Sequence, residues 1–200
     1  MKLYKLTDQD DRTKGGCQWG ENITVETDGK GGLCSAGFTH WYTHPLLAVL
    51  LNPIHGSYDL DTAHLWEGEG EVTKNDTGLK VGCVKATTTK RIELPAVTRE
   101  QRVRFAIACV WQVCKEKRWR KWAQGWIEGT DRSGAASSAS YASASASYAA
   151  SAAYYASSAA SYAAKAASSA SSSASAYVNL VAIVEWAITD SVDIPEDLNN

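Results

Sequence analysis

The residues best suited to chemistry lie in the first third of the chain. It holds all four histidines: His40, His44, His55 and His64. His40 and His44 have a spacing at which two imidazoles can bind zinc, and Cys17, Cys34 and Glu67 could complete such a site. No second pair of ligands with fixed spacing supports this site, so the pattern favours structural or surface roles for the histidines. We therefore expect neither a bound metal nor a cofactor.

Common catalytic motifs are missing from the sequence. It contains no P-loop and no GxSxG, HExxH or GxGxxG pattern. The glycines of residues 28–37 could form a loop around an anion. The pattern shows no helix start at the right offset after them, so a hairpin turn is the better interpretation.

Composition excludes several classes of protein. With 20 basic and 22 acidic residues in 200, no overall field directs the chain to nucleic acid or to a membrane. No apolar run approaches the roughly 20 residues that span a bilayer, and the first residues lack the apolar core of a signal peptide. The five cysteines are odd in number and have no CxxC spacing, which indicates a reduced, cytoplasmic chain without a membrane partner.

The elements that would position these residues are short strands and one short helix within residues 1–97. Residues 2–8 alternate like a strand, and glycine-rich turns separate two or three more. Residues 44–53 predict a helix that Thr43 or His44 caps, with Pro45 in its first turn and Asn52-Pro53 as its stop. Two further strands follow, around residues 63–72 and 79–94. We expect a compact α+β domain.

Residues 98–129 change to a helical period. Thr98 and Gln101 have the capping-box spacing, and apolar residues then recur at helical intervals. Basic residues and tryptophans alternate over the second half, as on some nucleic-acid-binding surfaces. The favoured interpretation is a helical hairpin with its tryptophans turned inward, because the largely acidic remainder of the chain opposes a docked phosphate backbone. We therefore expect no nucleic-acid partner.

An Ala/Ser-rich run dominates residues 130–190. Alanines in it recur at steps of four and three, which is the seam of a heptad repeat and predicts one long helix. The seam positions are Ala135, Ala139, Ala142, Ala146, Ala149, Ala153, Ala156, Ala160, Ala163, Ala167, Ala170 and Ala174. The same frame continues through Tyr177, Val181, Val184 and Ile188, where larger side chains would anchor the helix before it ends near Asp190. Such a helix either pairs with another chain, which we favour, or folds back near residues 168–175.

A second stripe follows the same repeat. Four tyrosines recur every seven residues and would form an aromatic rib: Tyr141, Tyr148, Tyr155 and Tyr162. The rib is either a second contact face or a cover over the protein's own globular part.

Several blocks of sequence resemble a family of uncharacterised phage and prophage proteins. They are "LYKLTD", "AGFTHWYTHPLLAVLLNPIH", "LKVGC" and "VTREQRVRFAI", and in that family they precede a "DRS" step and an alanine-rich run. The resemblance implies a phage or prophage protein, located in the host cytoplasm or associated with the virion. It implies no particular activity.

The order of elements around residues 36–72 is similar to the centre of ADP-ribosyltransferase-like folds. In those a strand histidine or tyrosine holds nicotinamide and a later glutamate activates the acceptor. The resemblance implies that His40 and Tyr42, with Glu67, Glu69 or Glu71, are candidate catalytic residues. No first-strand Arg or His matches the residue that binds the dinucleotide in that class, unless Arg12 does.

Together these patterns predict an α+β fold in four parts. They are an α+β domain at 1–97, a Trp-rich basic helical segment at 98–129, a long Ala/Ser-rich helix at 130–190 and an acidic tail at 191–200. The leading hypothesis for function is assembly or binding through the alanine seam, as a homo-oligomer or with a protein partner. The alternatives are an ADP-ribosyltransferase-like enzyme and an inhibitor of a host factor.

Overall fold

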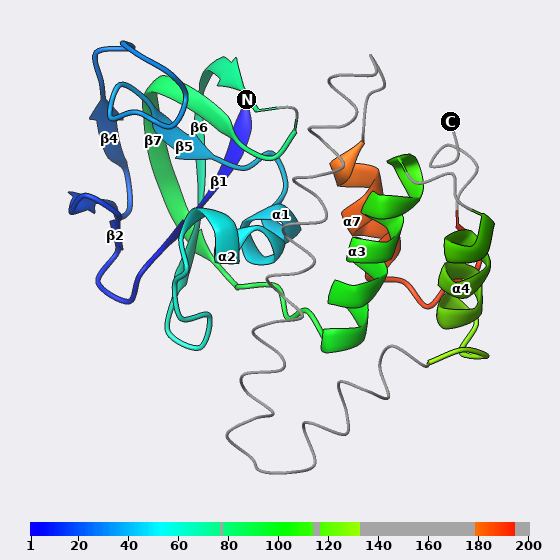
Figure 1. The fold of residues 1–200 in the computed structure, drawn as a ribbon. Coiled ribbons are helices and arrows are strands. Elements are labelled where there is room, and N and C mark those ends of the chain that lie inside the picture. The colour runs from blue at the N-terminus through cyan, green and yellow to red at the C-terminus, as the bar shows by residue number, and fades with distance from the viewer. Residues whose placement is uncertain (77, 114–116, 133–178, 195–200) are drawn as a thin grey trace. The chain divides into compact units, whose positions relative to one another are not determined.

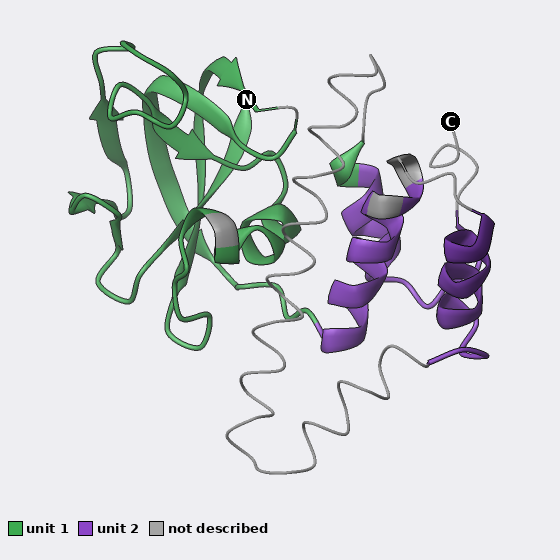
Figure 2. Ribbon diagram, viewed as in Figure 1, with its two compact units in different colours: residues 1–97, 179–181 green, residues 98–178, 182–200 purple. Residues whose placement is uncertain are grey.

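The computed structural model describes residues 1–76, 78–113, 117–132 and 179–194 (Figure 1). The chain divides into two compact units (Figure 2). Unit 1 comprises Met1–Val97 and Asn179–Val181. Unit 2 holds the described residues of 98–178 and of 182–200.

An antiparallel sheet forms the framework of unit 1. Its hydrogen-bonded order is β1-β6-β7-β4, and β5 also pairs with β7. The strands of this sheet are β1 (Lys2–Thr7), β4 (Ile23–Glu26), β5 (Thr39–Trp41), β6 (His64–Asn75) and β7 (Val81–Ile92). A separate small hairpin joins β2 (Arg12–Thr13) to β3 (Cys17–Gln18).

The two longest strands, β6 and β7, determine the shape of this sheet. β4 and β5 pair with different parts of β7, at residues 85–88 and 81–83. An isolated bridge between Tyr4 and Tyr42 ties the end of β5 back to β1. Breaks in the β6–β7 register near Gly68 and Gly70 bend the ribbon, as β-bulges do.

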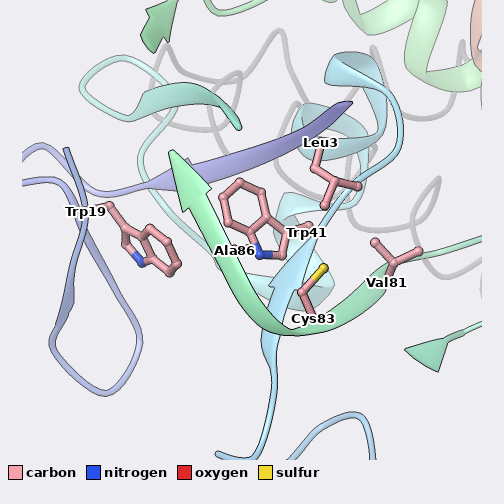
Figure 3. Close-up of a cluster of buried hydrophobic side chains, with 6 residues drawn as sticks. All are labelled: Leu3, Trp19, Trp41, Val81, Cys83 and Ala86. Atoms are coloured by element: carbon pink, nitrogen blue, oxygen red, sulfur yellow. The ribbon is translucent and has the colours of Figure 1, made fainter. Parts of the chain in front are cut away.

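The core under the sheet is built around Trp41, which is fully buried. Figure 3 shows it among the side chains of this cluster: Leu3, Trp19, Val81, Cys83 and Ala86. A Cβ atom on Gly68 would lie 2.4 Å from the carbonyl oxygen of Thr87 and 2.7 Å from the Trp41 ring. Only glycine therefore allows the indole to pack directly against the backbone of β6.

The predicted short helix is present as α1 (Pro45–Leu50). His44 caps it, because its Nδ1 accepts a hydrogen bond from the Leu46 amide at 3.3 Å, and Pro45 occupies the first turn. The predicted stop was wrong in detail. Asn52 and Pro53 begin a second short helix, α2 (Asn52–His55), because a proline in the first turn needs no amide partner.

The helices in the described part of unit 2 are α3 (Arg99–Val113), α4 (Lys117–Ile127) and most of α7 (Leu180–Ala187), whose first two residues are assigned to unit 1. The capping box at the start of α3 is confirmed. The Thr98 amide donates to Gln101 Oε1 at 2.8 Å, and the Gln101 amide donates to Thr98 Oγ1 at 3.2 Å. The Gln101 side chain also donates to the Ile188 carbonyl at 3.1 Å.

The predicted fold class, α+β with a helical hairpin and a long heptad helix, is wrong. The described residues form a mixed, mostly antiparallel sheet with short helices, and the longest helix among them, α3, has 15 residues. The strands expected around residues 63–72 and 79–94 are present as β6 and β7, so the error lies in how the elements assemble, which depends on pairings between distant segments. The alanine seam (139–174, with Ala135) and the tyrosine rib at 141, 148, 155 and 162 lie outside the described residues.

The predicted continuation of the heptad frame is also wrong. Asn179 is not helical, and α7 begins at Leu180. The buried side chains of α7 are Leu180, Ile183, Val184, Trp186 and Ala187, and Ile188 is exposed. Within the described part of the chain, no helix has the length and apolar character required to cross a bilayer.

Candidate functional site

A buried lysine lies at the centre of unit 1. Lys5 points inward from β1 and is only 4% exposed. Its Nζ lies 4.3 Å from the centre of the Trp19 ring and 4.6 Å from that of Trp41, and it donates to the His40 carbonyl at 2.5 Å. The two indoles meet edge to face with ring centres 5.3 Å apart. They therefore form an aromatic cage that the chain fills with its own ammonium group.

The surroundings of Lys5 determine its charge. Burial lowers the pKa of Lys5 to about 7, and nearby Cys17 and Cys83 act in the opposite direction when ionised. An amine near neutrality could serve as a base or form a Schiff base, but the cage leaves little room for a substrate. Sequence reasoning missed this centre. The available signal was a lysine at an inward position of β1, between Leu3 and Thr7 on the same face.

His40, the first of the predicted catalytic residues, is half-buried on β5. Its Nε2 contacts the carbonyl oxygen of Leu33. Burial lowers the pKa of His40, the Leu33 carbonyl raises it, and the positive charges of Lys80 and Lys5 lower it further. This imidazole therefore holds the loop before β5 against the sheet.

A cysteine and a lysine meet on the surface next to this loop. Cys34 is exposed, and Lys80 Nζ donates a hydrogen bond to its Sγ at 3.2 Å. Both neighbours of Cys34 are fixed, Leu33 by His40 and Ser35 through its hydroxyl, which donates to the Lys30 carbonyl at 2.9 Å. Two nucleophilic groups from segments 46 residues apart are thus held in direct contact.

Tyr42, the second predicted catalytic residue, contacts a different partner. Its hydroxyl lies 3.1 Å from His55 Nδ1, and the two rings stack with centres 5.8 Å apart. Burial raises the pKa of Tyr42, and the nearby Tyr58 raises it further. Tyr42 joins β5 to α2 and stays protonated at physiological pH.

The three candidate glutamates lie on β6. Glu67 forms ion pairs with Lys2 at 3.2 Å and with Lys90 at 3.8 Å. Glu69 and Glu71 line an open depression of about 460 Å³, whose other lining residues are Met1, Gly70, Lys85, Ala86 and Thr87. Neither His40 nor Tyr42 belongs to this lining. The structure does not bring the five predicted catalytic residues into one pocket, so it gives the ADP-ribosyltransferase-like alternative no support.

Asp11 is a polar hub that sequence reasoning missed. One carboxylate oxygen, Oδ1, lies 2.6 Å from His64 Nδ1 and accepts a hydrogen bond from Trp66 Nε1 at 2.9 Å. Asp11 has a positive φ of 60°, a conformation that Asp tolerates better than most residues. The carboxylate orients the imidazole and ties the loop after β1 to β6.

The residues of the hypothetical zinc site are also dispersed into separate contacts. His44 caps α1, Glu67 pairs with lysines, and Cys17 packs against the core cluster around Trp41. Among the described residues, no group of three or more His, Cys, Asp or Glu side chains could hold a metal ion.

Unit 2 contains a series of arginines stacked on tryptophans. Arg104 lies 4.3 Å from the Trp186 ring centre, Arg120 4.7 Å from that of Trp111, and Arg132 4.0 Å from that of Trp126. The predicted inward packing of tryptophans holds for Trp126, which is buried, while Trp119 and Trp122 are half-buried. These three arginines cover indole surface, so they contribute to packing as well as to charge.

Comparison with known proteins adds no family to this picture. No family model matches the chain, and the searches of curated proteins and of solved structures return no match.

Proposed function

We propose that the chain is a phage-type assembly or binding protein that associates with a second copy or a protein partner through its alanine-rich segment. The observation that carries the proposal is that the candidate catalytic side chains form structural contacts within unit 1. His40, Tyr42 and Glu67 each bond within unit 1 and hold its strands and loops in place. Unit 1 therefore has the character of a scaffold.

The same observation applies to the buried cations. Lys5 fills the cage formed by Trp19 and Trp41, and Arg104 stacks on Trp186. Aromatic cages and stacked arginines can recognise ligands, but here the chain's own side chains occupy them. This supports a protein whose described units serve as folded bodies and whose partner is bound elsewhere.

The alanine spacing supports the choice of the association segment. Twelve alanines recur at alternating steps of four and three between Ala135 and Ala174. Small side chains permit close approach of two backbones but bury little apolar area each. Such a surface is sensitive to bulk, which makes the proposal testable.

The experiment is a mass measurement by light scattering and sedimentation on the full chain. We expect an oligomer that Ala153→Leu with Ala156→Leu shifts toward monomer, because leucine forces the two surfaces apart. The matched control is Ser151→Leu with Ser158→Leu, which adds the same two side chains outside the seam and should leave the mass unchanged. A monomer at all concentrations that binds no protein partner contradicts the proposal, as do equal effects of the two variants.

A further inference from the structure

The Cys34–Lys80 contact is independent of the proposed association and of the core. It joins an exposed thiol to an amine at 3.2 Å, and the two residues lie on different segments. Cys34 lies in the loop before β5, while Lys80 immediately precedes β7. The pairing of Trp41 with Val81 brings these two segments together.

The contact is held from beneath by backbone packing. A Cβ atom on Gly82 would lie 2.4 Å from Leu33 Cδ1, so Leu33 packs directly on the backbone of β7. His40 contacts the Leu33 carbonyl, and the Ser35 hydroxyl fixes the other side of Cys34. The sulfur is therefore presented to solvent at a defined position next to the amine.

The chemistry of the pair follows from its charges. A lysine ammonium that donates to sulfur stabilises the thiolate, which is the nucleophilic form of cysteine. The other cysteines of the described residues are less accessible: Cys17 is half-buried, and Cys83 and Cys109 are buried. Burial raises the pKa of Cys83 and of Cys109, which keeps both as unreactive thiols.

We propose that Cys34 and Lys80 form a peroxide-responsive modification site, in which oxidation of the thiol leads to a covalent sulfur–nitrogen cross-link. In the first step the Cys34 thiolate attacks hydrogen peroxide. A sulfur–oxygen bond forms, the oxygen–oxygen bond breaks, and the departing hydroxide takes a proton from the Lys80 ammonium to become water. Sulfur is oxidised and peroxide is reduced.

The second step uses the amine that the first has produced. The neutral Lys80 nitrogen attacks the sulfur of the sulfenic acid, a sulfur–nitrogen bond forms, and hydroxide leaves and takes the proton released by nitrogen as a second water. Overall, one thiol, one amine and one peroxide give one sulfenamide and two waters. An excess of a small thiol returns both side chains to their original state.

The test is peptide mapping of the full chain after exposure to hydrogen peroxide. We expect one cross-linked peptide that carries Cys34 and Lys80, is lighter than its two parts by two hydrogens, and disappears on treatment with dithiothreitol. Labelling with a sulfenic-acid probe gives the rate of the first step, with half-buried Cys17 as the internal reference.

Two variants separate charge from nucleophile. Lys80→Arg keeps the positive charge, so Cys34 should oxidise at nearly the original rate and yield no cross-link. Lys80→Gln removes both, so oxidation should also slow by roughly fivefold, the effect of one unit charge near 4 Å in water. Cys34→Ser serves as the blank, and circular dichroism checks that each variant is folded. A Cys34 that oxidises no faster than Cys17, or a sulfenic acid that accumulates in the original protein without a cross-link, overturns the proposal.

Discussion

Among the described residues, each unit buries one cation against an indole at the same distance, yet the two centres differ in chemistry. Lys5 in unit 1 and Arg104 in unit 2 are 4% and 5% exposed, and each lies 4.3 Å from a tryptophan ring centre. Lys5 has a second indole and a carbonyl partner. Arg104 donates from Nη2 to the Ser191 carbonyl, while its Nε is buried without a hydrogen-bond partner among the described residues.

The difference shows two ways to accommodate a buried charge. A lysine can lose its proton, and burial moves the pKa of Lys5 to about 7, so the centre adjusts its charge to pH. An arginine remains charged at any pH at which proteins fold. The desolvation penalty of the buried Arg104 guanidinium therefore persists, and stacking on the Trp186 ring offsets it. We therefore expect the stability of unit 1 to depend on pH, and the stability of unit 2 to depend on the indole area that Arg104 covers.

The largest effect should follow the loss of the indole that is fully buried. Trp41→Ala removes a core side chain that contacts Lys5, Trp19 and the backbone at Gly68, and it should lower the free energy of unfolding by about 3–5 kcal/mol. Urea unfolding followed by circular dichroism measures this. The matched change in unit 2, Trp186→Ala, should cost less, because Trp186 keeps 6% of its surface exposed. An equal loss of stability in Trp41→Ala and Trp186→Ala would contradict this expected order of the two centres.

The next effect is a rise in stability with pH. Folding lowers the pKa of Lys5 from its ordinary value of 10.5 to about 7, so the unfolded chain binds more protons between these values. The free energy of unfolding should therefore increase above pH 7, by at most about 1.4 kcal/mol per pH unit. His40, whose pKa is lowered from 6.5, gives a rise only at lower pH. Above about pH 9.0 the buried thiols Cys83 and Cys109 oppose the trend, because burial raises the pKa of each.

Urea titrations at several pH values between 7 and 9 isolate the contribution of Lys5. The control is Lys5→Met, which keeps the length of the side chain and removes the amine, and its stability should vary little over this window. A variant that retains the full slope would assign the titration to another group.

The sequence predicted the local elements of both units better than their assembly. The His44 cap with Pro45 and the Thr98–Gln101 capping box are confirmed, because each depends on residues only a few positions apart. The sheet depends on pairings such as Lys2 with Glu69, which no local period encodes. This is why the predicted fold class failed while single elements were found.

The candidate site shows the same limit. His40 and Tyr42 lie two residues apart, and a resemblance in the order of elements made both candidates for one site, but their partners are Leu33 and His55 on different segments. The pairs Lys5–Trp41 and Cys34–Lys80 join segments 36 and 46 residues apart. The contacts that select these particular lysines and cysteines arise only from the fold.

A surface contact in unit 2 should give a smaller effect than the loss of Trp41 or the titration of Lys5. Thr98→Ala removes the hydroxyl that accepts from the Gln101 amide and should cost about 1 kcal/mol. Thermal or urea unfolding measures the loss. Thr98→Ser keeps the acceptor and should be nearly neutral, so a similar loss in both variants would show that the cap does not stabilise α3.

The smallest effect should come from removing the charge of Arg104 while keeping its bulk. Arg104→Met loses the hydrogen bond to Ser191 but also removes a buried guanidinium whose Nε has no partner among the described residues. An apolar side chain of similar length can still cover the Trp186 ring, and replacement of buried charges by apolar groups is often close to neutral. We therefore expect a change within about 1 kcal/mol, whereas Arg104→Ala, which uncovers the ring, should cost more. If Met proves as damaging as Ala in urea unfolding, the charge of Arg104 matters more than its area, and the contrast between the two centres reduces to the proton that only Lys5 can release.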